Sequence, residues 1–126
     1  MAGKAWDPNR SHIRVMLRGV RTEAHVGRHA WERHAERPTR LIVDVDLLAP
    51  TDGATVPLID YDVVRDALKS WPGQPHTELL ETLAEQIVTL CFSIPAVQAC
   101  RVAVRKPDIF NEADSAGIEI FRVRQA

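Results

Sequence analysis

Four segments of the chain alternate between apolar and polar residues, which is the period-two pattern of a strand with one buried face. In the first segment, Ile13, Val15 and Leu17 share one face. The pattern can be followed beyond this segment to Val26, where Gly27 interrupts it. The predicted strands are residues 12–20, 39–48, 97–105 and 117–123.

Two segments between the second and third strands carry apolar residues at helical spacing instead. The first helix is predicted over residues 61–71, and Pro72 ends it. The second helix is predicted to begin near Thr77, whose hydroxyl can cap it, and to close before Pro95. On a helical wheel of about 100° per residue, its apolar residues form one broad face, and Glu81 lies at the edge of that face.

The predicted order of elements is therefore β-β-α-α-β-β. Paired strands with the helices grouped between them favour an α+β fold with a four-stranded antiparallel sheet. Residues 1–11 are polar and are predicted to be a loose lead-in, and residues 12–126 to form a single domain. Because the edge strands of such a sheet must be blunted, covered or paired, we expect the chain to form homo-oligomers through them.

Composition and charge narrow the classes of function. Apolar residues make up 45% of the chain and charged residues 26%, as in a globular protein. The formal net charge of -1 argues against binding to nucleic acids or anionic membranes, which requires a basic surplus. The sequence shows neither an apolar run long enough to span a membrane nor a secretory signal. We therefore expect a cytoplasmic protein in which Cys91 and Cys100 are buried, reduced thiols.

Three histidines raise the hypothesis of a metal site, because His25, His29 and His34 are spaced four and five residues apart. A metal pair needs two ligands on one helix face, yet Gly27 lies between the first two histidines and the first ends a predicted strand. We therefore expect these histidines to lie on the surface or to line a site without a metal. The sequence also has no GxSxG elbow, P-loop or dinucleotide-binding glycine pattern.

Four polar residues are candidates for catalysis or binding. Glu32 lies in the connection after the first strand, and Tyr61, the only tyrosine, begins the first predicted helix. Glu81 borders the apolar face of the second helix, and Lys106 follows the third strand. Each residue also has an ordinary structural explanation, such as a solvated loop charge, a packing residue or a favourable acid near a helix N-terminus. Position along the chain does not decide between these interpretations.

The segments that contain these four residues resemble motifs of the dihydroneopterin aldolase family. They follow one another in the family's order over about residues 13–122, which is nearly the whole chain. No single motif is highly specific, but four in the right order, on the right predicted elements, are. The segments are VGRHAWER at 26–33, IDYDVV at 59–64, ELLETLAEQI at 78–87 and VRKPDIFNEADSAGIEIFR at 104–122.

The resemblance implies a tunnelling fold, in which two helices are inserted between the second and third strands of a four-stranded antiparallel sheet. Members of this family form rings of four subunits, often stacked into octamers, with active sites between neighbouring subunits. The likeness therefore implies a homo-tetramer or homo-octamer, which would pair the open sheet edges. It implies a small-molecule pterin substrate and no nucleic-acid or membrane partner.

The resemblance also implies a role for each matched residue. Glu81 would anchor the pterin through two parallel hydrogen bonds to its carboxylate. Leu80 would pack near the ring, and backbone groups around Leu79 and Leu80 would assist. Tyr61 would reach the ring from the adjacent subunit, together with Ile59. The remaining two matched residues would act on protons and on water: Lys106 as the proton carrier and Glu32 as the residue that positions substrate and water.

The implied activity is that of a lyase of folate biosynthesis that cleaves 7,8-dihydroneopterin into 6-hydroxymethyl-7,8-dihydropterin and glycolaldehyde. The dihydropterin carries a conjugated C=N bond that can accept electrons, so this retro-aldol reaction needs no cofactor or metal, only positioning and proton transfer. Arg28 departs from the family pattern, in which a small or apolar residue is common, and is a candidate for binding an anionic group. Two alternatives stay open, namely an epimerase acting on dihydroneopterin or its triphosphate, and a pterin- or purine-binding protein without turnover.

Overall fold

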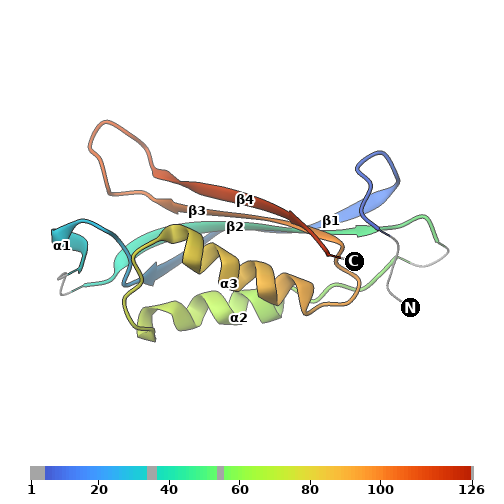
Figure 1. Cartoon of the computed structure of the whole chain (residues 1–126), viewed down its shortest axis with the longest axis horizontal. Coiled ribbons are helices and arrows are strands. Elements are labelled where there is room, and N and C mark those ends of the chain that lie inside the picture. The colour runs from blue at the N-terminus through green and yellow to red at the C-terminus, as the bar shows by residue number, and fades with distance from the viewer. Residues whose placement is uncertain (1–4, 34–36, 54–55, 126) are drawn as a thin grey trace.

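The four strands pair in chain order into one antiparallel sheet, β1-β2-β3-β4, and the computed structural model describes residues 5–33, 37–53 and 56–125. Two longer helices, α2 and α3, cover one face of this sheet (Figure 1). This arrangement confirms the predicted α+β class and the β-β-α-α-β-β order, to which the structure adds a short helix α1 and a 3-10 turn η1. The elements are β1 (His12–Ala24), α1 (Ala30–Arg33), β2 (Thr39–Pro50), α2 (Asp62–Ser70), η1 (Trp71–Gly73), α3 (Leu80–Phe92), β3 (Ala99–Lys106) and β4 (Ala116–Val123).

The first strand changes which of its residues face the helices part-way along its length. Its register against β2 shifts between Leu17 and Val20, and Gly19 has a φ of 62°, which glycine adopts at no steric cost. The backbone N–H of Gly19 donates to the Asp44 carboxylate at 2.6 Å. This β-bulge lets β1 continue to Ala24 with its apolar residues on the core side of the sheet.

The hydrophobic core lies between the helices and the sheet. Trp71, Leu68 and Ile87 are among its largest fully buried side chains, and they come from η1, α2 and α3. Alternate residues of the central strands β2 and β3 meet them. The residues of β2 and β3 in this core are Leu41, Val43, Val45, Leu47, Ala49, Cys100, Val102 and Val104.

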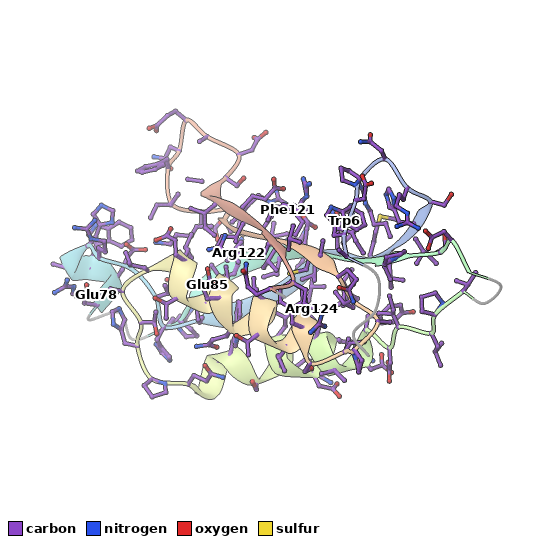
Figure 2. All side chains as sticks on the ribbon, turned by 45° about the vertical axis from the view of Figure 1, so that its right-hand side comes forward. Trp6, Glu78, Glu85, Phe121, Arg122 and Arg124 are labelled. Carbon is purple, nitrogen blue, oxygen red and sulfur yellow. The ribbon has the colours of Figure 1, made fainter. Side chains whose placement is uncertain are left out.

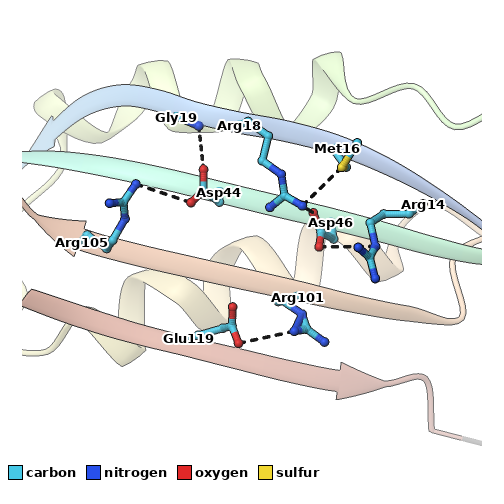
Figure 3. A network of polar contacts seen from close by, with 9 residues as sticks. All are labelled: Arg14, Met16, Arg18, Gly19, Asp44, Asp46, Arg101, Arg105 and Glu119. Carbon is cyan, nitrogen blue, oxygen red and sulfur yellow. Dashed lines mark hydrogen bonds and ion pairs between the residues drawn. The ribbon is translucent and has the colours of Figure 1, made fainter. Parts of the chain in front are cut away.

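The opposite face of the sheet is charged (Figure 3). Asp46 is 2% exposed and is paired with Arg18 at 2.8 Å and Arg14 at 3.7 Å, both from β1. Arg105 of β3 approaches Asp44 at 3.6 Å. These ion pairs give the carboxylates cationic neighbours, although Oδ1 of Asp46 accepts no hydrogen bond in the described part of the chain.

The second long helix begins later than its sequence pattern suggests. Its first residue is Leu80, and Leu79 occupies the N-cap position without a side-chain hydrogen bond, so Thr77 does not cap the helix. The reason is that the backbone of Thr77 is engaged in an isolated bridge with Val26. Its N–H donates to the carbonyl of His25 at 2.8 Å, and its carbonyl accepts from the N–H of Gly27 at 3.1 Å.

Side chains of β4 and of the segment after it hold α3 against the sheet (Figure 2). Arg122 and Glu85 face one another from β4 and α3 at 2.5 Å. Arg124 donates to the carbonyls of Phe92 and Ile94 at 2.9 and 3.0 Å, where a cation interacts favourably with the C-terminal end of the helix.

None of the helices in the described part of the chain is both long and apolar enough to cross a membrane.

The helix and strand ends that carry the candidate residues lie towards two different ends of the sheet. The short helix α1, the end of β3 and the start of α3 gather at one end of the molecule (Figure 1). The start of α2 lies towards the other end. Residues that follow β3 and residues that precede α2 are therefore held apart within one chain.

Candidate active site

An ion pair between a buried glutamate and a partly buried lysine joins α1 to the end of β3. The Nζ of Lys106 donates to Oε2 of Glu32 at 2.5 Å, across 74 positions of sequence. The side chain of Glu32 is 1% exposed and that of Lys106 is 12% exposed. Because such charges lose their hydration on burial, they require close partners, and these two residues provide partners for each other.

The second carboxylate oxygen of Glu32 is also occupied. Nδ1 of His29 lies 2.7 Å from Oε1, and the backbone N–H of His29 lies 3.4 Å from the same oxygen. Burial by itself would raise the pKa of the Glu32 carboxyl, but the hydrogen bonds from Lys106 and His29 outweigh it and hold this pKa below its usual value. Glu32 is therefore an ionised carboxylate held from both sides.

A glycine makes room for this carboxylate. Gly27 has a φ of 141°, and a Cβ at this position would lie 2.2 Å from the carboxyl carbon of Glu32. The carbonyl of Gly27 also lies 3.1 Å from Nε2 of His76, in the loop before α3. The interruption of the strand pattern by Gly27 thus coincides with the point where the chain turns around the ion pair.

The ion pair forms part of the wall of a cavity of about 250 Å³. At its rim, Arg40 and Asp108 form a two-point ion pair with distances of 2.7 and 2.9 Å. Lys106 thus has access to a space large enough for part of a small organic molecule. The lining residues are Trp31, Glu32, Pro38, Thr39, Arg40, Lys106, Asp108 and Ile109.

The start of α3 is tied to α1 at the same end of the molecule. Arg33 of α1 pairs with Glu78 at 2.6 Å, and the backbone of Thr77 bonds to His25 and Gly27, which precede α1. Glu81 follows in the first turn of α3 and is exposed. Leu79 is 40% exposed and Leu80 is partly buried, so a polar and an apolar surface lie side by side at this helix start.

The tyrosine singled out in the sequence is not part of this cluster. Tyr61 precedes α2, whose start lies towards the end of the sheet opposite α1 (Figure 1), and it is 44% exposed. Ile59, two residues earlier, is 6% exposed and belongs to the core. One chain thus brings Glu32, Lys106 and the start of α3 to one end and leaves Tyr61 at a distance from them.

Comparison with known proteins assigns this chain to a protein family. A family model described as FolB, dihydroneopterin aldolase, matches residues 15–121. A Streptomyces coelicolor protein named dihydroneopterin aldolase is 30% identical over 118 residues, which cover 88% of this chain and 98% of that protein. The chain belongs to the dihydroneopterin aldolase family.

Solved structures agree with this assignment. The dihydroneopterin aldolase of Burkholderia thailendensis bound to guanine is 28% identical, with a TM-score of 0.70 over 90% of this chain and 93% of that one. Two more distant structures share the fold. They are a putative dihydroneopterin aldolase from Vibrio cholerae, with 22% identity, a TM-score of 0.72 and coverage of 90% and 99%, and the E. coli enzyme in complex with neopterin, with 18% identity, a TM-score of 0.68 and coverage of 87% and 98%. The tunnelling fold expected from the sequence is therefore confirmed.

Among the other residues that the sequence singled out, Arg28 is exposed and directly follows Gly27 in this dihydroneopterin aldolase fold. Of the three histidines, His29 contacts Glu32, His25 accepts a backbone bond from Thr77, and His34 lies outside the described residues. No group of three or more His, Cys, Asp or Glu side chains suited to a metal gathers in residues 5–33, 37–53 and 56–125.

From the sequence, His29 is expected only to be one of several surface or site-lining histidines, and its bond to Glu32 is not predicted. The only indication in the sequence was the three-residue spacing, which places the two side chains on one side of a single helical turn. A turn as short as α1 carries no periodic pattern from which this contact could have been predicted.

Proposed function

We propose that this member of the dihydroneopterin aldolase family cleaves 7,8-dihydroneopterin into 6-hydroxymethyl-7,8-dihydropterin and glycolaldehyde, in folate biosynthesis. The observation that carries the proposal is the buried Glu32–Lys106 pair in the wall of a cavity, at the end of the sheet where α3 begins. The proposal includes a cytoplasmic location, which the two free thiols Cys91 and Cys100 favour.

The reaction requires proton transfer at two points. A base removes the proton from the side-chain hydroxyl group, the adjacent carbon–carbon bond breaks, and its electrons enter the conjugated C=N system of the dihydropterin as that system is protonated. Lys106 is the group that carries these protons, working through water, while Glu32 keeps the amine in place. Since the substrate itself accepts the electrons, the proposed mechanism uses neither a metal nor a cofactor.

Glu81 is the proposed anchor of the pterin ring. Its carboxylate, exposed in the first turn of α3, can accept two parallel hydrogen bonds from the amino group and ring N–H of a pterin. Leu79 and Leu80 provide apolar contact, and no side chain caps the start of the helix, where the N–H of Thr82 donates to the carbonyl of Leu79 at 3.2 Å. Arg28 is the proposed contact for an anionic group on the substrate.

The proposed site is completed by a second subunit. Tyr61 is exposed at the start of α2 and distant from the Lys106 end of its own chain, so it can contact a ligand there only as part of a neighbouring copy. Phe121 and Val123, on the open edge strand β4, are also exposed, as expected for an edge that pairs in a homo-tetramer or homo-octamer.

The activity is tested by incubating the purified protein with 7,8-dihydroneopterin and, separately, with its triphosphate, and identifying the products. Release of hydroxymethyl-dihydropterin and glycolaldehyde is the expected result. Conversion to the monapterin isomer alone would favour the epimerase, and binding without turnover would favour the non-catalytic alternative. A preference for the triphosphate that is lost in Arg28→Ala would assign the anionic group to Arg28.

The shared site is tested by subunit mixing. Lys106→Ala and Tyr61→Ala proteins are co-expressed and the mixed oligomers are assayed. If the two residues of a site come from different subunits, Lys106 is intact in about half of the sites and Tyr61 in about half, independently of each other. Random mixing in equal amounts then restores both residues in about a quarter of the sites. If they come from the same subunit, the mixture stays as inactive as the two parents.

A further inference from the structure

His29 lies at the surface above the buried ion pair. Its side chain is 56% exposed, and its ring is stacked on Trp31 with a centroid separation of 5.1 Å and an interplanar angle of 9°. Trp31 is itself 60% exposed. The imidazole is thus held between a flat ring on one side and the Glu32 carboxylate, which restricts its orientation although it is open to solvent.

The two oxygens of Glu32 have different partners. Oε2 accepts from Lys106, and Oε1 lies 2.7 Å from Nδ1 of His29. The backbone N–H of His29 is 3.4 Å from Oε1, at the long limit for a hydrogen bond. Without the imidazole, Oε1 would keep only this weak contact in a position that is 1% exposed, and the carboxylate would be free to rotate away from Lys106.

The charge of Glu32 determines where the proton of His29 lies. Since the pKa of the carboxyl is lowered, Glu32 is an acceptor, and Nδ1 of His29 must carry the hydrogen of this bond. In the neutral ring, Nε2 is then the unprotonated nitrogen. A carboxylate that accepts from one ring nitrogen fixes both the tautomer and the plane of a histidine, and the imidazole fixes the carboxylate in return.

We propose that His29 is a positioning residue for the cleavage reaction, which holds the Glu32 carboxylate so that Oε2 stays on the Nζ of Lys106. The inference rests on the proposed function, in which Lys106 carries protons. His29 acts through Glu32, so its loss changes the placement of the amine and not the binding of the pterin ring at the start of α3.

The test compares three variants with the parent enzyme in steady-state assays of dihydroneopterin cleavage. His29→Leu keeps the bulk of the side chain but removes the donor, and we expect kcat to fall about tenfold while KM changes less than about twofold. His29→Asn places an amide N–H near the position of Nδ1 and is expected to restore kcat to within about threefold of the parent. His12→Leu is the matched control, because Nδ1 of His12 lies 2.8 Å from the carbonyl of Arg10 away from the site, and it should leave kcat unchanged.

The ring nitrogen shifts of His29, measured by NMR on the parent protein above the titration range of the ring, provide a readout that does not depend on activity. The Nδ1–H tautomer is expected, and a predominant Nε2–H tautomer would overturn the inference. An active parent in which His29→Leu keeps the parental kcat, or in which His29→Asn is as slow as His29→Leu, would also overturn it. A parent that shows the Nδ1–H tautomer but does not cleave dihydroneopterin would contradict the proposed function and leave the Glu32–His29 bond supported.

Discussion

The candidate site residues at the two ends of the sheet differ in burial and in their contacts within the chain. At the end of β3, the side chains of Lys106 and Glu32 are 12% and 1% exposed and are joined at 2.5 Å. At the start of α2, Tyr61 is 44% exposed, and Leu58 nearby in the sequence is 92% exposed. Folding of one chain is thus enough to assemble the Glu32–Lys106 pair, whereas the proposed role of Tyr61 involves the surface of a second chain.

The buried pair is better explained by function than by stability. Removing two charges from water is costly, and replacing a buried ion pair by apolar residues is often neutral or stabilising. A hydrophobic core of β2, β3, α2 and α3 already holds the fold together on the other side of the sheet from the charged face. The position of Lys106 and Glu32 in the wall of a cavity is therefore consistent with the proposal that their charges take part in the reaction.

Of the predicted changes, removing Lys106 at the end of β3 should have the largest effect, and that effect is on kcat. We expect Lys106→Ala to lower kcat by about 10²- to 10⁴-fold, the range for loss of a general acid or base, with a smaller loss of pterin affinity. The comparison requires steady-state kinetics together with calorimetric titration of the product pterin. Lys106→Met retains most of the buried side-chain volume and should be equally slow, whereas Lys69→Ala, at an exposed position on α2, should be unaffected. A larger loss in affinity than in kcat would contradict the assigned role.

Adding a side chain at Gly27 should destabilise the fold by crowding the Glu32 carboxylate at the same end of the sheet. The new Cβ of Gly27→Ala would meet the Glu32 carboxylate at 2.2 Å, and the φ of 141° is unfavourable for alanine. We expect the free energy of unfolding to fall by about 2–4 kcal/mol, from backbone strain and overpacking together. Urea titration gives this value. Gly73→Ala is the control, because its Cβ would meet no atom within 4 Å; equal midpoints for both variants would contradict the crowding at Gly27.

Glu81 tests whether the exposed start of α3 binds the ligand. Glu81→Ala should weaken pterin binding by roughly tenfold or more, because it removes hydrogen bonds to a charged acceptor. Its free energy of unfolding should change by less than about 0.5 kcal/mol, since the side chain is exposed. Calorimetric titration and urea unfolding measure the two effects. Unchanged affinity would exclude Glu81 as the anchor, and Gln86→Ala, at an exposed position further along α3, serves as a control.

The smallest predicted effect concerns pH. The pKa of Glu32 in the folded protein lies below its unfolded value of about 4.3, so the carboxylate adds stability above that pH and loses it as the pH falls through the folded pKa. The stability difference between the parent and Glu32→Gln should therefore be largest near neutral pH and shrink below about pH 4. Urea unfolding at several pH values measures it. A difference that stays constant down to pH 3 would show that the charge of Glu32 does not stabilise the fold.

Much of the fold was predictable because its information is local. Alternating residues identified all four strands, and the change from odd-numbered apolar positions up to Leu17 to even-numbered ones from Val20 onwards matches the bulge at Gly19. The start of α3 was predicted too early because Thr77 has the side chain of a good cap. Its backbone pairs with Val26, a distant partner along the chain that no local pattern reveals.

The candidate site was predictable only as a set of residues, not as a geometry. Resemblance to the family singled out Glu32 and Lys106, but Glu32 stands in a charged, histidine-rich segment that is typical of solvated loops. Its burial depends on Gly27 and on contacts with β3, which only tertiary packing provides. In the proposed assembly the partner of Tyr61 lies on a second chain, which neither a local pattern nor the fold of one chain could identify.

The glycine at position 27 limits which substitutions can be combined at positions 27 and 32. The volume that a Cβ would need there is filled by the Glu32 carboxylate, so the two positions occupy one shared space. In a library of variants, we expect side chains at 27 to be recovered mainly together with a shorter residue at 32, and glutamate at 32 mainly with glycine at 27. The pair should therefore be inherited as a unit, with the loop around it free to vary.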